Sequence, residues 1–214
     1  MSKSCGANIL KSAHSMDIRR KIAREAATLL YMGLEKEYMQ AKLRAAETLG
    51  VHLLPTNLEI ALELDRIAEE NEGPLRRERL IRMRREALEL MRILKNFNPT
   101  LVGSVWRGTI TRDSDIDITV YSDDPKEVLE LLKPHFRILK TERTAVMKNG
   151  RSIISFHILL ELTSGDKAEI TVRGTEEMDV RERCEIYGDE IVGLKTCELE
   201  HLLKTDPTRR FVPF

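Results

Sequence analysis

Asp115 and Asp117, two aspartates separated by one isoleucine, are the side chains of this sequence that point most directly to chemistry. Residues 115–121 alternate polar and apolar side chains, which is the period of a strand with one covered face. Residues two apart in a strand point to the same side, so we expect both carboxylates to project from one face. Carboxylates this close raise each other's pKa, and a bound divalent cation removes that cost. The pair therefore predicts a metal site, and oxygen ligands favour Mg²⁺.

Gly103 and Ser104 lie a short distance upstream, where a predicted strand over residues 100–103 ends and a short helix begins. The free N–H groups and positive dipole end of a helix start attract an anion. Glycine permits a close backbone approach, and the serine hydroxyl adds a donor. An anion cradle followed by a metal pair predicts a site for a nucleoside triphosphate.

This pattern resembles the polymerase β-type nucleotidyltransferase superfamily, whose signature is Gly-Ser, a spacer, and an acidic-apolar-acidic strand. The form Gly-Ser-x-x-Arg-Gly-Thr over residues 103–109 is similar to archaeal CCA-adding enzymes. Over its whole length the chain resembles archaeal nucleotidyltransferases that carry an N-terminal helical region. The resemblance implies that Gly103 and Ser104 hold the triphosphate and that Asp115 and Asp117 bind two Mg²⁺ ions.

The resemblance also implies a third metal-binding and catalytic carboxylate on a neighbouring strand. Glu169 is flanked by apolar residues, and its parity places it on one face with Thr171 and Arg173. Many members of the superfamily have aspartate at this position. Glu161 and Asp166 remain alternatives to Glu169. In the implied mechanism, one Mg²⁺ lowers the pKa of the acceptor hydroxyl and the other neutralises charge on the leaving pyrophosphate.

Three further residues have two interpretations each. Arg107 and Thr109 either contact the phosphates, as nucleotide-binding residues, or brace the short helix that follows Gly103. His157 lies in a strand whose alternate positions are apolar and either faces the cleft or is structural, and the structural interpretation is preferred.

The implied reaction transfers a nucleoside monophosphate from an NTP, with ATP favoured, to an acceptor hydroxyl and releases pyrophosphate. Similarity to CCA-adding enzymes favours an RNA 3′ end, and an arginine-rich helix predicted over residues 74–97 offers a contact surface for RNA. One alternative is modification of a protein or small molecule. The other is a non-catalytic nucleotide- or RNA-binding module, against which the intact acidic set argues. The arginines are Arg76, Arg77, Arg79, Arg82, Arg84, Arg85 and Arg92.

Composition sets the broad class. The chain has 214 residues, 42% of them hydrophobic, which is enough to build a core. Lys and Arg total 35, as do Asp and Glu, so net charge does not indicate a nucleic-acid or membrane partner. Three widely spaced cysteines fit neither a disulfide framework nor a zinc site and suggest a reducing cytoplasm. No run of roughly 18 apolar residues predicts a membrane span. The oligomeric state is left open.

The elements fall into two regions, which together predict an α+β fold. Residues 1–15 are expected to form a flexible extension, residues 16–98 an all-helical region, and residues 99–214 a small mixed-sheet nucleotidyltransferase domain with flanking helices. The expected helices cover residues 17–50 with a bend at Gly33, 56–71 from a Thr56 capping box, 74–98, 125–132 and 198–203. The expected strands are 115–121, 137–148, 151–162 and 168–173, with a hairpin at Asn149-Gly150.

Overall fold

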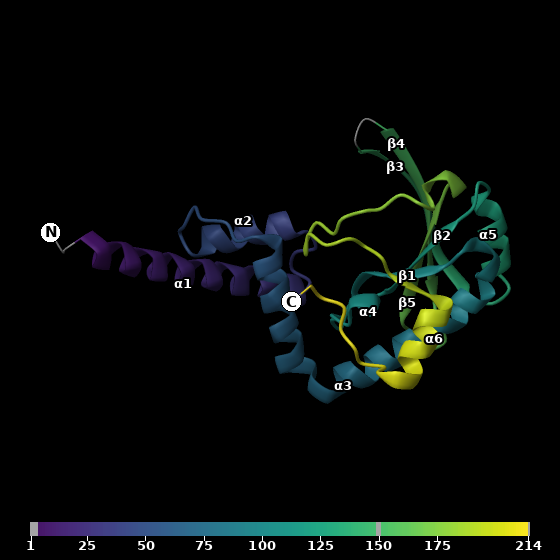
Figure 1. Ribbon diagram of the computed structural model, residues 1–214, viewed down its shortest axis with the longest axis horizontal. Helices are drawn as coiled ribbons and strands as arrows, with labels where there is room; N and C mark the ends of the chain where they lie inside the picture. The colour runs from purple at the N-terminus through teal and green to yellow at the C-terminus, as the bar shows by residue number, and fades with distance from the viewer. Residues whose placement is uncertain (1–3, 149–150, 214) are drawn as a thin grey trace. The chain divides into compact units, whose positions relative to one another are not determined.

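The computed structural model describes residues 4–148 and 151–213, which divide into two compact units (Figure 1). The first unit holds the chain up to Gly73 together with Glu185–Gly188, and the second holds Pro74–Cys184 and the chain from Asp189 onward. None of the helices in the described part of the chain combines the length and the hydropathy needed to span a bilayer.

The first unit is helical, as predicted, but its first helix is not continuous. α1 (Ser4–Tyr31) and α2 (Tyr38–Thr48) replace the single helix expected over residues 17–50, because the chain leaves helical geometry at Gly33, where φ is +69°. Residues 4–15, expected as a flexible extension, lie in α1, and residues 1–3 of that extension are outside the described residues. The core of this unit is rich in alanine: Ile22, Ala23, Ala26, Ala27, Ala41, Ala45, Ala46, Ile60, Ile67 and Ala68.

α3 (Asn57–Ile93) consists of two helical segments separated by Gly73, whose φ of 51° and ψ of −131° are not helical. The first segment begins with the predicted capping box, which is confirmed. The Thr56 Oγ1 accepts the N–H of Glu59 at 3.2 Å, and the Glu59 carboxylate accepts the N–H of Thr56 at 2.6 Å. Pro74 then starts the second segment, where its missing N–H costs no helical bond.

The second segment of α3 belongs to the unit that contains the sheet. Leu80, Met83, Leu90 and Met91 are buried in the same apolar cluster as the strands. The chain therefore divides into its two compact units at Gly73-Pro74, whereas the sequence predicts a boundary between residues 98 and 99. That expectation followed the change from helix to strand at Pro99, whereas membership of a unit depends on which core a helix buries its apolar face in. A 3₁₀ turn, Lys95–Phe97, joins α3 to the first strand.

The sheet is mixed and six-stranded, which confirms the predicted α+β class. Its strand order is β3-β4-β5-β2-β1-β6, with β2 and β5 parallel and all other neighbours antiparallel. The β3–β4 hairpin pairs as far as Lys148 and Arg151, while the predicted Asn149-Gly150 turn lies outside the described residues. The strands are β1 (Thr100–Val102), β2 (Ile116–Tyr121), β3 (Arg137–Lys148), β4 (Arg151–Glu161), β5 (Lys167–Arg173) and β6 (Leu194–Lys195).

One face of this sheet is covered and the other carries the polar residues. Ile118, Ile158 and Ile170 point from adjacent strands into the core that the second segment of α3 shares with α5 (Pro125–Leu132) and α6 (Thr196–Thr205). Figure 1 shows α6 beside that segment of α3, where Arg92 and Glu200 form an ion pair. Strand alternation then directs the side chains of Asp117 and its neighbours at i+2 and i+4 to the opposite face.

Candidate active site

Asp117 and Glu169 are directly opposite each other on neighbouring parallel strands. The β2–β5 register pairs Asp117 with Glu169 and Thr119 with Thr171, so both carboxyl side chains leave the polar face at the same level. Asp115 lies two residues before Asp117, immediately ahead of β2. The structure thus brings together all three residues that the sequence predicts as acidic ligands.

Gly103 is pressed against the carboxylate of Asp117. It follows β1, begins the five-residue helix α4 (Gly103–Arg107) and has a φ of +69°. A Cβ atom at this position would lie only 1.9 Å from the Asp117 Oδ2 atom. Glycine is therefore required twice, by the left-handed backbone and by the packing of the aspartate against the chain. Ser104, the second residue of the predicted phosphate cradle, follows in the first turn of α4.

The pKa values of both aspartates are raised. Burial, followed by repulsion from Asp115 and Glu169, raises the pKa of Asp117 from 3.8 to about 7. Burial, followed by repulsion from Glu169, also raises the pKa of Asp115, while Lys167 and Arg79 oppose that shift. Carboxyl groups that resist ionisation in this way are common at functional sites, and they become stable anions when a cation binds between them.

The loop that leads into Asp115 is fixed by an arginine of α3. Arg79 donates to the carbonyl oxygens of Thr111 at 2.8 Å and Ser114 at 3.1 Å, and also to Asp166 at 3.1 Å. Asp166 is therefore part of this clamp, which it shares with Arg82 at 2.7 Å. This contact explains why Asp166, considered above as a third metal ligand, serves instead to hold the loop.

A second arginine of α3 fixes the helix that starts at Gly103. Arg84 is fully buried and donates to the carbonyl oxygens of Val105 at 3.1 Å and Trp106 at 2.9 Å. It also donates to the carbonyl oxygens of Pro207 and Arg209 in the C-terminal segment. Burial lowers the pKa of Arg84 to about 10, which still leaves the guanidinium charged at neutral pH.

Arg107 braces the site and does not line it. Its side chain is buried and donates to both carboxylate oxygens of Asp189, at 2.8 and 3.1 Å, and to the carbonyl oxygen of Phe211. Its guanidinium also lies 4.5 Å from the centre of the Trp106 ring. The backbone N–H of Thr109 closes α4 on the carbonyl oxygen of Ser104 at 3.0 Å. The buried Arg107 side chain thus fits the bracing interpretation, while a phosphate contact by the Thr109 side chain stays a prediction.

His157, for which the sequence left a cleft-facing and a structural interpretation open, contacts the carboxylate of Glu169. Its Nδ1 atom lies 2.7 Å from Glu169 Oε1, and its Nε2 atom lies 2.9 Å from Ser155 Oγ and 3.0 Å from Thr144 Oγ1. Its face parity was visible in the sequence. The contact with Glu169 was not, because it depends on the register between β4 and β5, which pairs His157 with Thr171.

The donor chemistry of the site fits a divalent cation. Asp115, Asp117 and Glu169 offer only carboxylate oxygens, which are the ligands that Mg²⁺ prefers. Within residues 4–148 and 151–213, no three His, Cys, Asp or Glu side chains form a ready-made metal cluster. The arrangement described is instead an aspartate pair with Glu169 opposite and held at one oxygen by His157.

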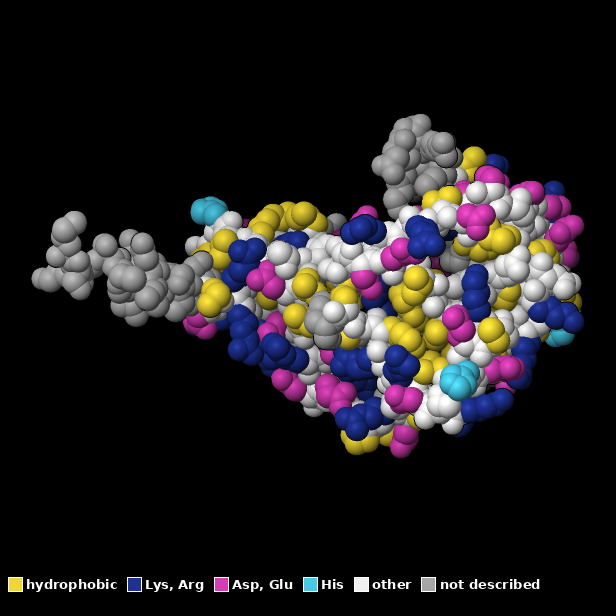
Figure 2. Space-filling model, viewed as in Figure 1, with side chains coloured by type: hydrophobic (Ala, Val, Ile, Leu, Met, Phe, Trp, Pro, Cys, Tyr) yellow, Lys and Arg dark blue, Asp and Glu magenta, His cyan; other side chains and the backbone are white. Residues whose placement is uncertain are grey.

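Several arginines of the arginine-rich segment of α3 are bound within the sheet unit. Arg76, like Arg79 and Arg84, donates to a backbone carbonyl, that of Ile110 at 2.7 Å. Arg82 and Arg92 are paired with acidic residues. On the face seen in Figure 2, Lys and Arg side chains are interleaved with Asp and Glu. Arg76, Arg79 and Arg84 are accordingly structural, while Arg77 and Arg85 are exposed, so RNA contact through residues 74–97 stays a prediction.

The described residues of the sheet unit line at least two cavities. One of about 550 Å³ begins at Gly103 and extends along the polar face past Thr119 and Tyr121 to Arg173 and Lys195. This volume is in the range of small-molecule sites.

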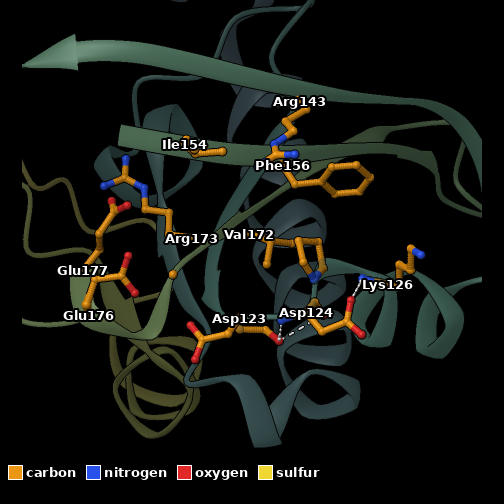
Figure 3. A pocket seen from close by; sticks show the side chains of 13 residues that line it. Asp123, Asp124, Lys126, Arg143, Ile154, Phe156, Val172, Arg173, Glu176 and Glu177 are labelled. Carbon is orange, nitrogen blue, oxygen red and sulfur yellow. Dashed lines mark hydrogen bonds between the residues drawn. The ribbon is translucent and has the colours of Figure 1, made fainter. Parts of the chain in front are cut away.

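The other cavity, of about 520 Å³, follows the carboxyl ends of β2 and β5. Figure 3 shows Arg143 and Phe156 on one side of it and Glu176 and Glu177 on another. None of the three predicted metal ligands lines either cavity, and the first reaches the site through Gly103.

Comparison with known proteins gives one family match and several similar solved structures. The sequence model of the family described as "Nucleotidyltransferase domain" matches residues 81–159. No curated protein matches the chain. Similar solved structures include Cid1 in complex with the UTP analog UMPNPP, with 17% identity over 56% of this chain and 38% of that chain and a TM-score of 0.32.

Two further similar structures are a cytoplasmic RNA terminal U-transferase and the GLD-2/RNP-8 complex. The first has 21% identity over 54% of this chain and 34% of that chain, with a TM-score of 0.28. The second has 11% identity over 58% of this chain and 45% of that chain, with a TM-score of 0.33. This chain therefore spans less than half of the length of each of the three. The family match is the informative result: residues 81–159, which include Arg84, Gly103 and the aspartate pair, are similar to the nucleotidyltransferase domain.

Proposed function

We propose that the chain is a Mg²⁺-dependent nucleotidyltransferase that moves a nucleoside monophosphate from an NTP, with ATP preferred, to an acceptor hydroxyl and releases pyrophosphate. One observation carries the proposal. Asp117 and Glu169 face each other across neighbouring strands, and the backbone of Gly103 touches the Asp117 carboxylate. A family match over residues 81–159 supports the same assignment.

Asp115, Asp117 and Glu169 are the residues that would hold Mg²⁺. Their fit is supported by charge: burial and mutual repulsion raise the pKa of both aspartates, so the ionised forms gain stability when a cation is present. Bound Mg²⁺ would supply a lowered pKa at the acceptor hydroxyl and charge neutralisation at the leaving pyrophosphate.

The remaining residues of the site would place the nucleotide. The backbone at Gly103 approaches Asp117 without an intervening side chain, which lets a polyphosphate lie against the chain beside the acidic residues. Ser104 would add a hydroxyl donor to the phosphates. The cavity of about 550 Å³ that begins at Gly103 would receive the sugar and base, with Thr119, Tyr121 and Lys195 along its wall.

An incubation with Mg²⁺ and α-labelled NTPs tests this function directly. The protein is mixed in parallel with RNA, with protein extract and with small metabolites, and the pool that takes up label identifies the acceptor. Label is expected to require both Mg²⁺ and Asp117, so the substitution Asp117→Ala should remove it, with a loss of at least about 1,000-fold for a group that holds the metal.

Asp113→Ala is the matched control for that experiment. Asp113 lies in the same loop as the aspartate pair, but its side chain is 70% exposed, so its removal should leave transfer unchanged. Label transfer that survives Asp117→Ala would contradict the proposed site. NTP binding without label in any pool would favour the non-catalytic module instead.

A further inference from the structure

His157 joins Glu169 to a chain of hydroxyl groups that crosses three strands. Nδ1 of the imidazole lies 2.7 Å from Glu169 Oε1 on β5. On the other side of the ring, Nε2 lies 2.9 Å from Ser155 Oγ, which is on β4 like His157, and 3.0 Å from Thr144 Oγ1 on β3. The two hydroxyls also bond to each other at 2.8 Å. Both ring nitrogens therefore have partners.

These partners define which nitrogen of the neutral ring carries the proton. An ionised carboxylate only accepts hydrogen bonds, so the Nδ1–H of His157 donates to Glu169. Nε2 is then the acceptor, and the hydroxyl of Ser155 or Thr144 donates to it. Since each hydroxyl can also donate to the other, the whole set is satisfied by the Nδ1–H tautomer.

Glu169 is the acidic residue of the site that most needs such a partner. Glutamate has one more rotatable bond than aspartate, and holding it in one conformation has an entropic cost. The Glu169 side chain is also 37% exposed, so little packing restrains it. Asp115 and Asp117 lie close enough for repulsion from Glu169 to raise their pKa values. Without a donor, that repulsion would turn Glu169 away.

We propose that His157 is a positioning residue, which holds Glu169 Oε1 through Nδ1 and leaves the second carboxylate oxygen free for a metal ion. Ser155 and Thr144 hold the other side of the ring and so fix its orientation. The inference rests on the proposed function, because it treats Glu169 as a metal ligand. Partners that orient a ligand in this way typically change metal affinity by about 10–100-fold when they are removed.

Substitutions at position 157 separate positioning from simple packing. In His157→Asn, the amide nitrogen takes the place of Nδ1 and can still donate to Glu169. In His157→Gln, the amide reaches toward Ser155 and Thr144, as Nε2 does. In His157→Leu, no polar group remains on the side chain. The readout is the affinity for Mn²⁺ alone, measured by electron paramagnetic resonance of the free ion as it is titrated with protein.

We expect the Mn²⁺ affinity of His157→Asn to be close to that of the wild type. The affinities of His157→Gln and His157→Leu should be lower by about tenfold or more. If His157 only packed in a polar environment, the Asn and Gln variants would have equal affinities for Mn²⁺. His201→Leu is the matched control, because His201 is an exposed histidine on α6 and its loss should not change Mn²⁺ affinity. Circular dichroism of each variant shows whether the fold is intact, and the Asn and Gln pair keeps the test decisive if the leucine variant does not fold.

A double substitution shows whether His157 acts through Glu169. If it does, His157→Gln adds no further loss of Mn²⁺ affinity once Glu169→Gln is present. Additive losses, or equal affinities for the Asn and Gln variants, would overturn the inference while leaving transferase activity of the wild type intact. A wild-type protein that bound no Mn²⁺ would overturn the inference together with the proposed function.

Discussion

The decisive residues of this protein are carboxyl groups placed where their charge is unfavourable. Asp117 is packed against the backbone of Gly103 and opposed by Glu169, and neither neighbour compensates a negative charge. Such an arrangement weakens the protein unless a ligand restores the balance. Under the proposed function, the requirements of metal binding and of stability therefore conflict at Asp117.

That conflict predicts how stability depends on pH in the metal-free protein. The pKa of Asp117 is about 7 in the folded state against 3.8 for an ordinary aspartate, so between these values the folded state retains a proton that the unfolded state releases. The free energy of unfolding should consequently fall as the pH rises from about 4 to 7. Urea denaturation in the presence of EDTA measures it, and Asp117→Asn should remove most of this fall. If the free energy of unfolding of Asp117→Asn fell with pH as steeply as that of the wild type, the assignment of this pH dependence to Asp117 would be contradicted.

Gly103 gives a second prediction for a single residue. In Gly103→Ala the new methyl group would lie 1.9 Å from Asp117 Oδ2 and must displace the carboxylate, so Mn²⁺ affinity and nucleotidyl transfer should fall by at least about tenfold. Gly165→Ala is the matched control, because Gly165 also has a positive φ, of +86°, but no atom lies within 4 Å of its added Cβ. Both variants should lose roughly 1–2 kcal/mol of stability from backbone strain. Equal metal affinity in the two variants would contradict the role of Gly103.

Among the elements, the second segment of α3 is the one that positions the site. Arg79 holds the loop before Asp115, and Arg84 holds the turn of helix after Gly103, each through backbone carbonyl oxygens. A buried carbonyl that loses its donor destabilises the fold. These two arginines therefore fix the segments that carry the site residues to the core of the unit. Arg79 and Arg84 of this arginine-rich helix therefore hold together the unit that carries the site.

Arg84→Ala should therefore lower the free energy of unfolding by at least about 3 kcal/mol, because it leaves the carbonyl oxygens of Val105 and Trp106 and two further carbonyls without their donor. The adjacent Arg85 is exposed, and Arg85→Ala should change the free energy of unfolding by less than about 0.5 kcal/mol. Chemical denaturation of the two variants makes the comparison. Equal losses would show that the carbonyl contacts of Arg84 contribute little.

Local patterns predicted much of the fold, and long-range contacts account for what was missed. The alternation over residues 115–121 and the capping box at Thr56 are encoded in adjacent residues, and both were found from the sequence. The contact between His157 and Glu169 needs the register of two strands, which alternation alone does not specify. The bend expected at Gly33 is a full break, because a glycine signals the turn but not how far the chain leaves the helix.

For the molecule as a whole, the two compact units divide at Gly73-Pro74, inside the region predicted as helical. It assigns Leu80, Met83 and Met91 to the core of the sheet unit. The unit that carries the site is consequently longer than the region of strands, and the family match, which begins at residue 81, starts inside that helix.

Truncation tests this division. A fragment starting at Pro74 retains the buried face of α3 and should unfold cooperatively, whereas one starting at residue 99 loses that face and should be largely unfolded. Thermal unfolding followed by circular dichroism distinguishes the two fragments. Equal cooperativity would show that α3 is dispensable for the sheet unit and would restore the boundary at residue 98.

The most direct test of the central claim is the position of a bound cation. Crystals grown with Mn²⁺ and a non-hydrolysable NTP analogue, measured at the manganese absorption edge, give an anomalous peak at each ion. We expect the strongest peak between Asp115 and Asp117, within about 2.3 Å of their carboxylate oxygens, with the phosphates beside Gly103. An ordered analogue with no peak at these aspartates, or with manganese bound elsewhere, would contradict the account.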